Sequence, residues 1–401
     1  MATNNAGPAV TTTPNIVTPT VTAGATAVPF DPSNVAIGGG TIRGTGWNEF
    51  YGFSGQNTKK WRAALARTRV GGTRAKIACV GDSTTRGMGS GSGDLFTGTQ
   101  ANSYPTQLAA LLNARGLPAQ ANSLFGNGAT TITTSDPRVT LGAGWAAGGT
   151  LLGGSLLAGT AATGFLGLQP SVSVDTFDTY YVAGGLGTAT LNINGGATLA
   201  TLDGSGASNI LKNTVTGSLA ANQLRVTYAS GSAFWVAGID AYNSAAKEVA
   251  VWNLGASGAK VADVRNAGSG FSFAFCLPKL APDLTIIDLT INDWAPPTNL
   301  ASYTADMQAL IAAALSTGDV ILMTGVPSST SSATAVNQAA FVSANYDLAK
   351  ANGIPLIDLS YRWTDYTTSN ALGMYYDSLH PSARGYSDVA QSVANVLLNL
   401  G

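Results

Sequence analysis

Two short segments far apart in the chain carry side chains that could act together on an ester. Ser83 follows the apolar run KIACVG, and His380 lies near the C-terminus in Asp377-Ser378-Leu379-His380-Pro381. A serine hydroxyl becomes an effective nucleophile when a neighbouring base takes its proton. His380 is the single histidine of the chain, so it is the one imidazole that could be this base. Asp377, three residues earlier, has the spacing to orient the imidazole and stabilise its cationic form.

Each of these motifs also has a structural interpretation. A serine in a Gly-Asp-Ser turn is more often a turn residue, and a single histidine is more often a core or surface residue. The segment is not the G-x-S-x-G elbow of other hydrolases, because Thr85 occupies the last position. The Asp-x-x-His spacing and the position of Ser83 after a strand favour the catalytic interpretation.

The composition excludes several classes of function. Of 401 residues, 20 are Lys or Arg and 21 are Asp or Glu, giving a net charge of -1. Without a basic surplus, we expect neither nucleic acid nor an anionic membrane as a partner. Two cysteines and one histidine are too few for a disulfide scaffold or a multi-histidine metal site, so no metal or other cofactor is expected. The charge-free stretch between Arg138 and Asp175 contains Gly pairs and a Pro, which favour short strands over a membrane span.

Residues 1–45 are rich in Thr, Pro, Val and Ala, which predicts an extended arm. The first 15 residues lack the basic and apolar regions of a signal peptide. We expect an extracellular, cell-surface or virion-associated protein exported by a route that this segment does not reveal. A cytoplasmic location is the alternative.

Apolar runs alternate with helical patterns in residues 46–124 and 244–401. KIACVG, LTIIDLTIND, DVILMTG and IPLIDLS have the continuous apolar character of strands buried on both faces, which predicts a parallel, doubly wound α/β sheet. Between these parts, residues 125–243 contain VSVDTFDTYYV, QLRVTYA and AFWVAGIDAY, which alternate apolar and polar residues. They predict an inserted antiparallel β-sandwich. Ligands of parallel sheets bind at the carboxyl ends of the strands, where Ser83 is expected.

Four motifs in order resemble the sequence blocks of the SGNH hydrolases, in the GDSL lipase/esterase superfamily. Gly81-Asp82-Ser83-Thr84 matches the first block and Asp377–Pro381 the last. Asn253-Leu254-Gly255-Ala256-Ser257-Gly258 matches the second. Thr290-Ile291-Asn292-Asp293 matches the third, with Thr290 where the family usually has Gly. The resemblance covers about residues 76–122 and 248–401 and implies a three-layer α/β/α, flavodoxin-like hydrolase domain.

The resemblance also implies the role of each residue. Ser83 would be the nucleophile, His380 the base and Asp377 the residue that orients it. The oxyanion would be bound by three donors: the backbone N–H groups of Ser83 and Gly258, with Gly255 the less favoured alternative, and the side-chain amide of Asn292. A serine mechanism of this kind needs no metal or other cofactor.

Five further residues are candidate substrate contacts: Arg86, Trp294, Tyr180, Tyr181 and Trp235. The arginine could bind a carboxylate or hydroxyl of the substrate, and the tryptophan after Asn292 could form a pocket wall. The three aromatic residues of the predicted sandwich could stack on a sugar ring. Alternating aromatic residues in a strand are more often core residues, and this alternative stays open.

These observations predict a serine esterase that hydrolyses short acyl esters, most of all O-acetyl groups on a polysaccharide. A sandwich beside an esterase domain resembles the carbohydrate-binding-like domains of polysaccharide deacetylases, and no long apolar lid helix is evident. The alternatives are a general short-chain carboxylesterase or lipase, and a non-catalytic phage-tail or cell-surface glycan-binding component with an esterase-like fold. The expected partner is an acylated carbohydrate or a small ester. Neither the glycan nor the oligomeric state follows from the sequence.

Overall fold

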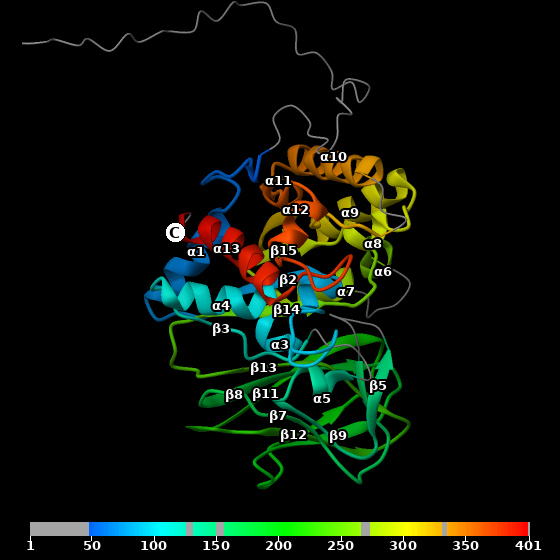
Figure 1. Cartoon of the computed structure of the whole chain (residues 1–401). Helices are drawn as coiled ribbons and strands as arrows, with labels where there is room; N and C mark the ends of the chain where they lie inside the picture. The colour runs from blue at the N-terminus through cyan, green and yellow to red at the C-terminus, as the bar shows by residue number, and fades with distance from the viewer. Residues whose placement is uncertain (1–47, 126–130, 150–155, 266–272, 331–334, 400–401) are drawn as a thin grey trace, which may run out of the picture. The chain divides into compact units, whose positions relative to one another are not determined.

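The computed structural model describes residues 48–125, 131–149, 156–265, 273–330 and 335–399 (Figure 1). The arm expected over residues 1–45 lies outside these ranges, so its interpretation stays a prediction. The two parts with alternating strands and helices together form one sheet. The segment between them forms two other sheets.

A seven-stranded sheet joins the two α/β parts of the chain. Its strands follow in the order β1 (Phe50–Tyr51), β17 (Leu356–Ile357), β16 (Asp319–Met323), β15 (Leu284–Asp288), β2 (Ala75–Gly81), β14 (Val249–Gly255) and β3 (Ala119–Gln120). All neighbours are parallel except β1 and β17. Counted along the chain, β2, β14, β15, β16 and β17 stand in the order 2-1-3-4-5, which is the flavodoxin-like order. The predicted parallel α/β sheet is therefore confirmed.

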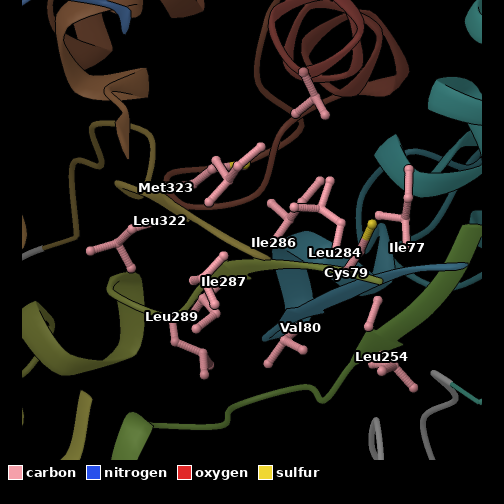
Figure 2. Close-up of a cluster of buried hydrophobic side chains, with 14 of the residues drawn as sticks. Ile77, Cys79, Val80, Leu254, Leu284, Ile286, Ile287, Leu289, Leu322 and Met323 are labelled. Carbon is pink, nitrogen blue, oxygen red and sulfur yellow. The ribbon is translucent and has the colours of Figure 1, made fainter. Parts of the chain in front are cut away.

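The central strands are buried because their sequences are apolar on both faces. Ile77, Cys79 and Ile286 are completely buried, and Figure 2 shows the apolar side chains of these strands in one cluster. The register is what matters for the site, since Gly81 pairs with Gly255 on one side and with Asp288 on the other. The loops that follow β2, β14 and β15 therefore start at one edge of the sheet.

The helices pack in two sets. One set contains α4 (Tyr104–Ala114), which contacts β14 and α13 (Ala383–Asn399). In the other, α9 (Leu300–Leu315) contacts β16 and three more helices: α6 (Val261–Arg265), α7 (Phe273–Leu280) and α10 (Ala335–Asn352). The remaining helices are α1 (Lys59–Arg69), α2 (Ser83–Arg86), α3 (Thr99–Asn102), α5 (Ile132–Ser135), α8 (Ile291–Trp294), α11 (Leu359–Trp363) and α12 (Tyr366–Ala371). None of the helices in the described ranges has the length and hydropathy needed to cross a membrane.

Residues 139–242, which we call the two-sheet segment, form two five-stranded antiparallel sheets. The first has the order β10 (Ala200–Asp203), β9 (Thr188–Ile193), β12 (Leu224–Ser230), β7 (Leu166–Leu168) and β4 (Val139–Leu141). The second has the order β11 (Asn209–Ala220), β8 (Val174–Ala183), β13 (Phe234–Tyr242), β6 (Leu156–Gly159) and β5 (Trp145–Gly149). Buried residues of both sheets form one cluster, with Leu191 and Val226 from the first and Phe177 and Val236 from the second. The alternating pattern thus reflects strands that bury apolar side chains against a second sheet.

The two-sheet segment packs closely on the parallel-sheet part. Leu124 forms an antiparallel bridge with Ile239 of β13. The ring of Phe125 lies 5.5 Å from that of Tyr180 in β8 and 5.4 Å from that of Trp252 in β14. These aromatic residues belong to the same buried cluster as the parallel sheet, so the hydrophobic core is continuous across this junction.

A buried ion pair crosses the same junction. Arg74 Nη2, just before β2, lies 2.6 Å from Asp240 Oδ2 in β13. Asp240 is 1% exposed, and the guanidinium of Arg74 also lies 3.5 Å from the ring centroid of Tyr242. Removing one partner of a buried pair leaves an uncompensated charge away from water. The pair should therefore contribute strongly to the attachment of the two-sheet segment.

We expect Arg74→Met to lower the free energy of unfolding by about 3–5 kcal/mol, because Asp240 would be left buried without its cation. Urea unfolding followed by circular dichroism measures the change. Arg67→Met is the matched control: Arg67 lies 3.0 Å from Asp283, but its side chain is 43% exposed, so we expect a loss below about 1 kcal/mol. Equal losses in the two variants would contradict the role given to the Arg74–Asp240 pair.

Candidate active site

Ser83 stands where β2 turns into the single helical turn α2. Asp82 caps this turn, since its Oδ1 accepts hydrogen bonds from Thr84 N at 2.8 Å and from Thr84 Oγ1 at 2.9 Å. A Cβ on Gly81 would lie 1.9 Å from Thr85 Oγ1, so the sharp turn requires glycine at the strand end. The turn holds Ser83, which is 3% exposed, at the edge where the central strands end.

The imidazole of His380 lies between the hydroxyl of Ser83 and the carboxylate of Asp377. His380 Nε2 is 3.0 Å from Ser83 Oγ, and His380 Nδ1 is 2.9 Å from Asp377 Oδ2. The other oxygen, Asp377 Oδ1, accepts hydrogen bonds from the backbone N–H groups of Leu379 at 2.8 Å and His380 at 2.6 Å. This arrangement can move a proton from the hydroxyl to the imidazole and stabilise the imidazolium that results.

The surroundings of Asp377 keep its carboxylate charged. Partial burial raises its pKa, but the hydrogen bonds donated by the side chain and backbone of His380 outweigh this effect and lower the pKa to about 2. Asp377 therefore carries a full negative charge at any pH where His380 could act as a base.

Potential hydrogen-bond donors follow the two neighbouring strands. Gly258, after β14, is exposed and has φ +76°, a left-handed conformation that favours glycine. Its N–H has no hydrogen-bond partner within the part of the chain that the structure describes. The N–H of Gly255 already donates to Asn253 Oδ1 at 3.0 Å. Asn292, in α8, donates one amide hydrogen to Ala259 O at 3.1 Å, so its second hydrogen can face a ligand.

Three aromatic residues expected at the substrate are buried in the core. Tyr180 is 4% exposed and packs against Trp252, and Tyr181 is 8% exposed and stacks on Phe234. Trp294 is completely buried. This burial favours the alternative that the three are core residues, and a contact of any of them with substrate stays a prediction. In β8 even adjacent tyrosines are both buried, because one face packs on the parallel-sheet part and the other on the first sheet of the segment.

Trp235 is only partly buried against the core shared with the parallel sheet. A role for Trp235 in sugar binding stays a prediction.

Arg86 is buried as well. It is 3% exposed, and its guanidinium points inward: Nη1 donates to Ser257 Oγ at 2.9 Å, and Nη2 donates to Thr131 Oγ1 at 3.0 Å and to Ser135 Oγ at 2.8 Å. These hydroxyl groups hold the side chain inside the protein, and a direct contact between Arg86 and substrate stays a prediction.

The structure adds a residue that the sequence analysis did not single out. Tyr376 is 43% exposed, and its N–H donates to His380 O at 2.9 Å. A Cβ on Gly89 would lie 2.9 Å from the Cβ of Tyr376 and 3.1 Å from the Cβ of His380, so these two side chains leave the backbone close together. The signal in the sequence was the position of this tyrosine directly before Asp377.

A second addition is a pair of buried carboxyl groups beneath the Ser83 turn. Thr84 Oγ1 lies 2.9 Å from Asp82 Oδ1 and 3.4 Å from Asp288 Oδ2. Burial raises the pKa of Asp82 to about 6 and raises that of Asp288 well above its ordinary value, with the charge of Asp82 adding to the second shift. Since like charges this close disfavour double ionisation, the pair releases its protons less readily than two separate carboxyl groups would. Across the described ranges, no group of three or more His, Cys, Asp or Glu side chains could hold a metal ion.

The buried pair predicts an unusual pH dependence of stability. The ordinary pKa of Asp82 is 3.8 and its folded value is about 6, so the folded state binds this proton more tightly than the unfolded chain. The tighter binding of this proton adds to the free energy of unfolding. The added stability is fully present below about pH 4 and is lost as the pH rises through 6. Burial also raises the pKa of Asp288, so we expect Asp288→Asn, which stays neutral, to reduce the loss of stability as the pH rises above about 4.

Urea unfolding at several pH values measures this effect. Asp347→Asn is the control, because Asp347 is exposed and its replacement should leave the pH dependence unchanged. A pH dependence of Asp288→Asn identical to that of the unmodified protein would show that Asp288 does not contribute to this loss of stability.

Part of the chain matches a known hydrolase family, and the fold is similar to that of a known esterase. Residues 217–387 match the GDSL-like lipase/acylhydrolase family, a range that includes Gly258, Asn292 and His380 but not Ser83. A search of curated protein sequences gives no match. A solved structure described as a peptidoglycan O-acetylesterase in action is similar over 88% of this chain and 99% of its own, with a TM-score of 0.68 and 15% identity.

Two other solved structures are similar over a smaller part of the chain. The lipase/acylhydrolase from Enterococcus faecalis is 23% identical over 37% of this chain and 75% of its own, with a TM-score of 0.32. A catalytic mutant of an acetylxylan esterase from Geobacillus stearothermophilus is 19% identical over 38% of this chain and 73% of its own, with a TM-score of 0.31. Of these three similarities, the one to the peptidoglycan O-acetylesterase is high enough to indicate a shared fold.

Proposed function

We propose that this chain, of which residues 217–387 match the GDSL-like lipase/acylhydrolase family, is a serine esterase that removes short acyl groups, acetyl above all, from a polysaccharide. The observation that carries the proposal is the 3.0 Å contact between Ser83 Oγ and His380 Nε2, with Asp377 on the other ring nitrogen. The hydroxyl of Ser83, the imidazole base of His380 and the orienting carboxylate of Asp377 thus lie in the order that acyl transfer requires.

The proposed reaction has two steps. Ser83 Oγ attacks the ester carbonyl while its proton passes to His380 Nε2, and the tetrahedral intermediate then releases the sugar hydroxyl, which takes that proton. Water next attacks the acyl-serine and gives a proton to His380, which returns it to Ser83 Oγ as the carboxylic acid leaves. Asp377 stabilises the imidazolium in both steps without accepting the proton.

In both steps the carbonyl oxygen becomes an oxyanion. We infer that the N–H groups of Ser83 and Gly258 and the side-chain amide of Asn292 bind it, because all three follow strands that end at the same sheet edge. One such donor is worth about 10²–10³ in rate. The hydrogen bond from Asn292 to Ala259 O would hold the amide in place before the reaction.

A glycan substrate is supported by two observations. Tyr376, whose side chain is exposed and leaves the backbone close to that of His380, has an aromatic ring on which a sugar can stack. The similarity to the peptidoglycan O-acetylesterase covers 88% of this chain, more than the two α/β parts alone. We infer that residues 125–243 are a β-sandwich inserted into a three-layer α/β/α hydrolase domain formed by residues 46–124 and 244–401. An acylated glycan outside the cell or on a virion surface would suit this organisation.

We expect Ser83→Ala to lower kcat on p-nitrophenyl acetate by about 10³ or more while the circular dichroism spectrum stays unchanged, because no other hydroxyl replaces the nucleophile. Ser378→Ala is the matched control, since Ser378 is exposed between Asp377 and His380, and it should keep full activity. Acetate release from O-acetylated peptidoglycan and acetylated xylan tests the substrate class. More than a tenth of the activity left in Ser83→Ala would remove this serine from the mechanism.

Tyr376→Ala should lower kcat/KM on an acetylated glycan about tenfold more than on p-nitrophenyl acetate, because the small ester has no sugar ring to stack. Tyr376→Phe keeps the ring and should restore the ratio of the two activities. Leu372→Ala is the control and should leave the ratio unchanged. It removes an exposed apolar side chain that is not among the nearest neighbours of Gly89. If Tyr376→Ala lowers both activities equally, the tyrosine supports His380 structurally and is not a sugar-binding residue.

A further inference from the structure

Arg86 carries a buried positive charge without a negative partner. It is 3% exposed, and the groups that accept its hydrogen bonds are the hydroxyls of Ser257, Thr131 and Ser135. Its Nε is buried and has no hydrogen-bond partner. Among the residues that the structure describes, no carboxylate lies within ion-pair distance of this guanidinium.

Such an arrangement is costly for folding. An ionised group that leaves water normally needs an opposite charge, and hydroxyl groups compensate only part of the loss of hydration. Burial lowers the pKa of Arg86 to about 10, so the guanidinium still carries its charge at neutral pH. Five other arginines among the described residues form ion pairs with Asp or Glu. Arg86 forms none.

The position of Arg86 connects the two segments that would bind the oxyanion. It is the last residue of α2, the turn that begins with Ser83. Its backbone packs directly on β14, since a Cβ on Gly255 would lie 2.2 Å from Arg86 N and Asn253 Nδ2 donates to Arg86 O at 3.3 Å. Its guanidinium then holds Ser257, the residue directly before Gly258.

We propose that Arg86 is a positioning residue that ties the Ser257–Gly258 turn to the Ser83 turn and whose uncompensated charge favours the oxyanion over the neutral ester. The inference rests on the proposed esterase function. The hydrogen bond to Ser257 sets the direction of the Gly258 N–H, and the charge interacts with the carbonyl oxygen only once that oxygen becomes negative.

The proposal predicts where the effect of Arg86 appears in the kinetics. An interaction that strengthens only in the transition state changes kcat, whereas a contact with the bound ester would change KM. Loss of one oxyanion-hole donor lowers kcat by about 10²–10³, and misplacing the Gly258 N–H should approach this range.

The test compares three variants on p-nitrophenyl acetate. We expect Arg86→Met to lower kcat about 100-fold and Ser257→Ala about tenfold, with KM within about threefold in both. Ser135→Ala is the matched control, because it removes a hydroxyl that accepts from the other terminal nitrogen of the same guanidinium, Nη2, and kcat should fall less than about threefold. An equal fall of kcat in Ser257→Ala and Ser135→Ala would overturn the proposal. A rise of KM with kcat unchanged would overturn it as well.

Inhibition by phenylboronic acid gives a second measurement, since its adduct with the serine hydroxyl carries the negative charge of the intermediate. The inhibition constant should rise in Arg86→Met and Ser257→Ala in proportion to the fall in kcat/KM, and an unchanged constant would contradict the proposal. If Arg86→Met does not fold, the two serine variants decide the question. Ser83→Ala measured in parallel separates the outcomes: if it remains active the proposed function fails, and if it is inactive only the role of Arg86 is under test.

Discussion

Gly81 pairs with Gly255 on one side and with Asp288 on the other, and this register fixes where three central strands release the chain. Neither glycine can carry a side chain, because a Cβ on Gly81 would lie 1.9 Å from Thr85 Oγ1 and one on Gly255 would lie 2.2 Å from Arg86 N. The Ser83 turn can therefore lie directly against β14. A shift of one residue in either pairing would separate Ser83 from the segments that carry Gly258 and Asn292.

The region around this edge holds more buried charge than its stability requires. Asp82 and Asp288 lie on either side of Thr84 with no Lys or Arg partner among the described residues, and Arg86 is buried among hydroxyls. Folding would cost less free energy if apolar side chains replaced these groups. Under the proposed function, their concentration next to Ser83 fits a site in which preorganised charges and hydroxyl groups act on a transition state.

The two-sheet segment uses its aromatic residues for attachment. Tyr180 packs on Trp252, and Asp240 pairs with Arg74, so these side chains are covered by the protein itself. Tyr376, in the loop that also carries His380, has an exposed side chain. If the substrate is a glycan as proposed, its contacts would include the parallel-sheet part as well as the two-sheet segment.

The sequence by itself determined the parallel α/β sheet and the pairing of Ser83 with His380 and Asp377. Continuous apolar runs are a local property, and the chain has a single imidazole with a carboxylate three residues before it. The burial of Tyr180, Tyr181 and Trp294 was decided only by the tertiary structure, because alternation along a strand does not tell which other surface covers each face. The same holds for the inward direction of Arg86 and for the proximity of Asp82 and Asp288. Those features depend on contacts between strands and loops that are more than 100 residues apart in the sequence. A local sequence pattern does not tell which distant segments will come into contact.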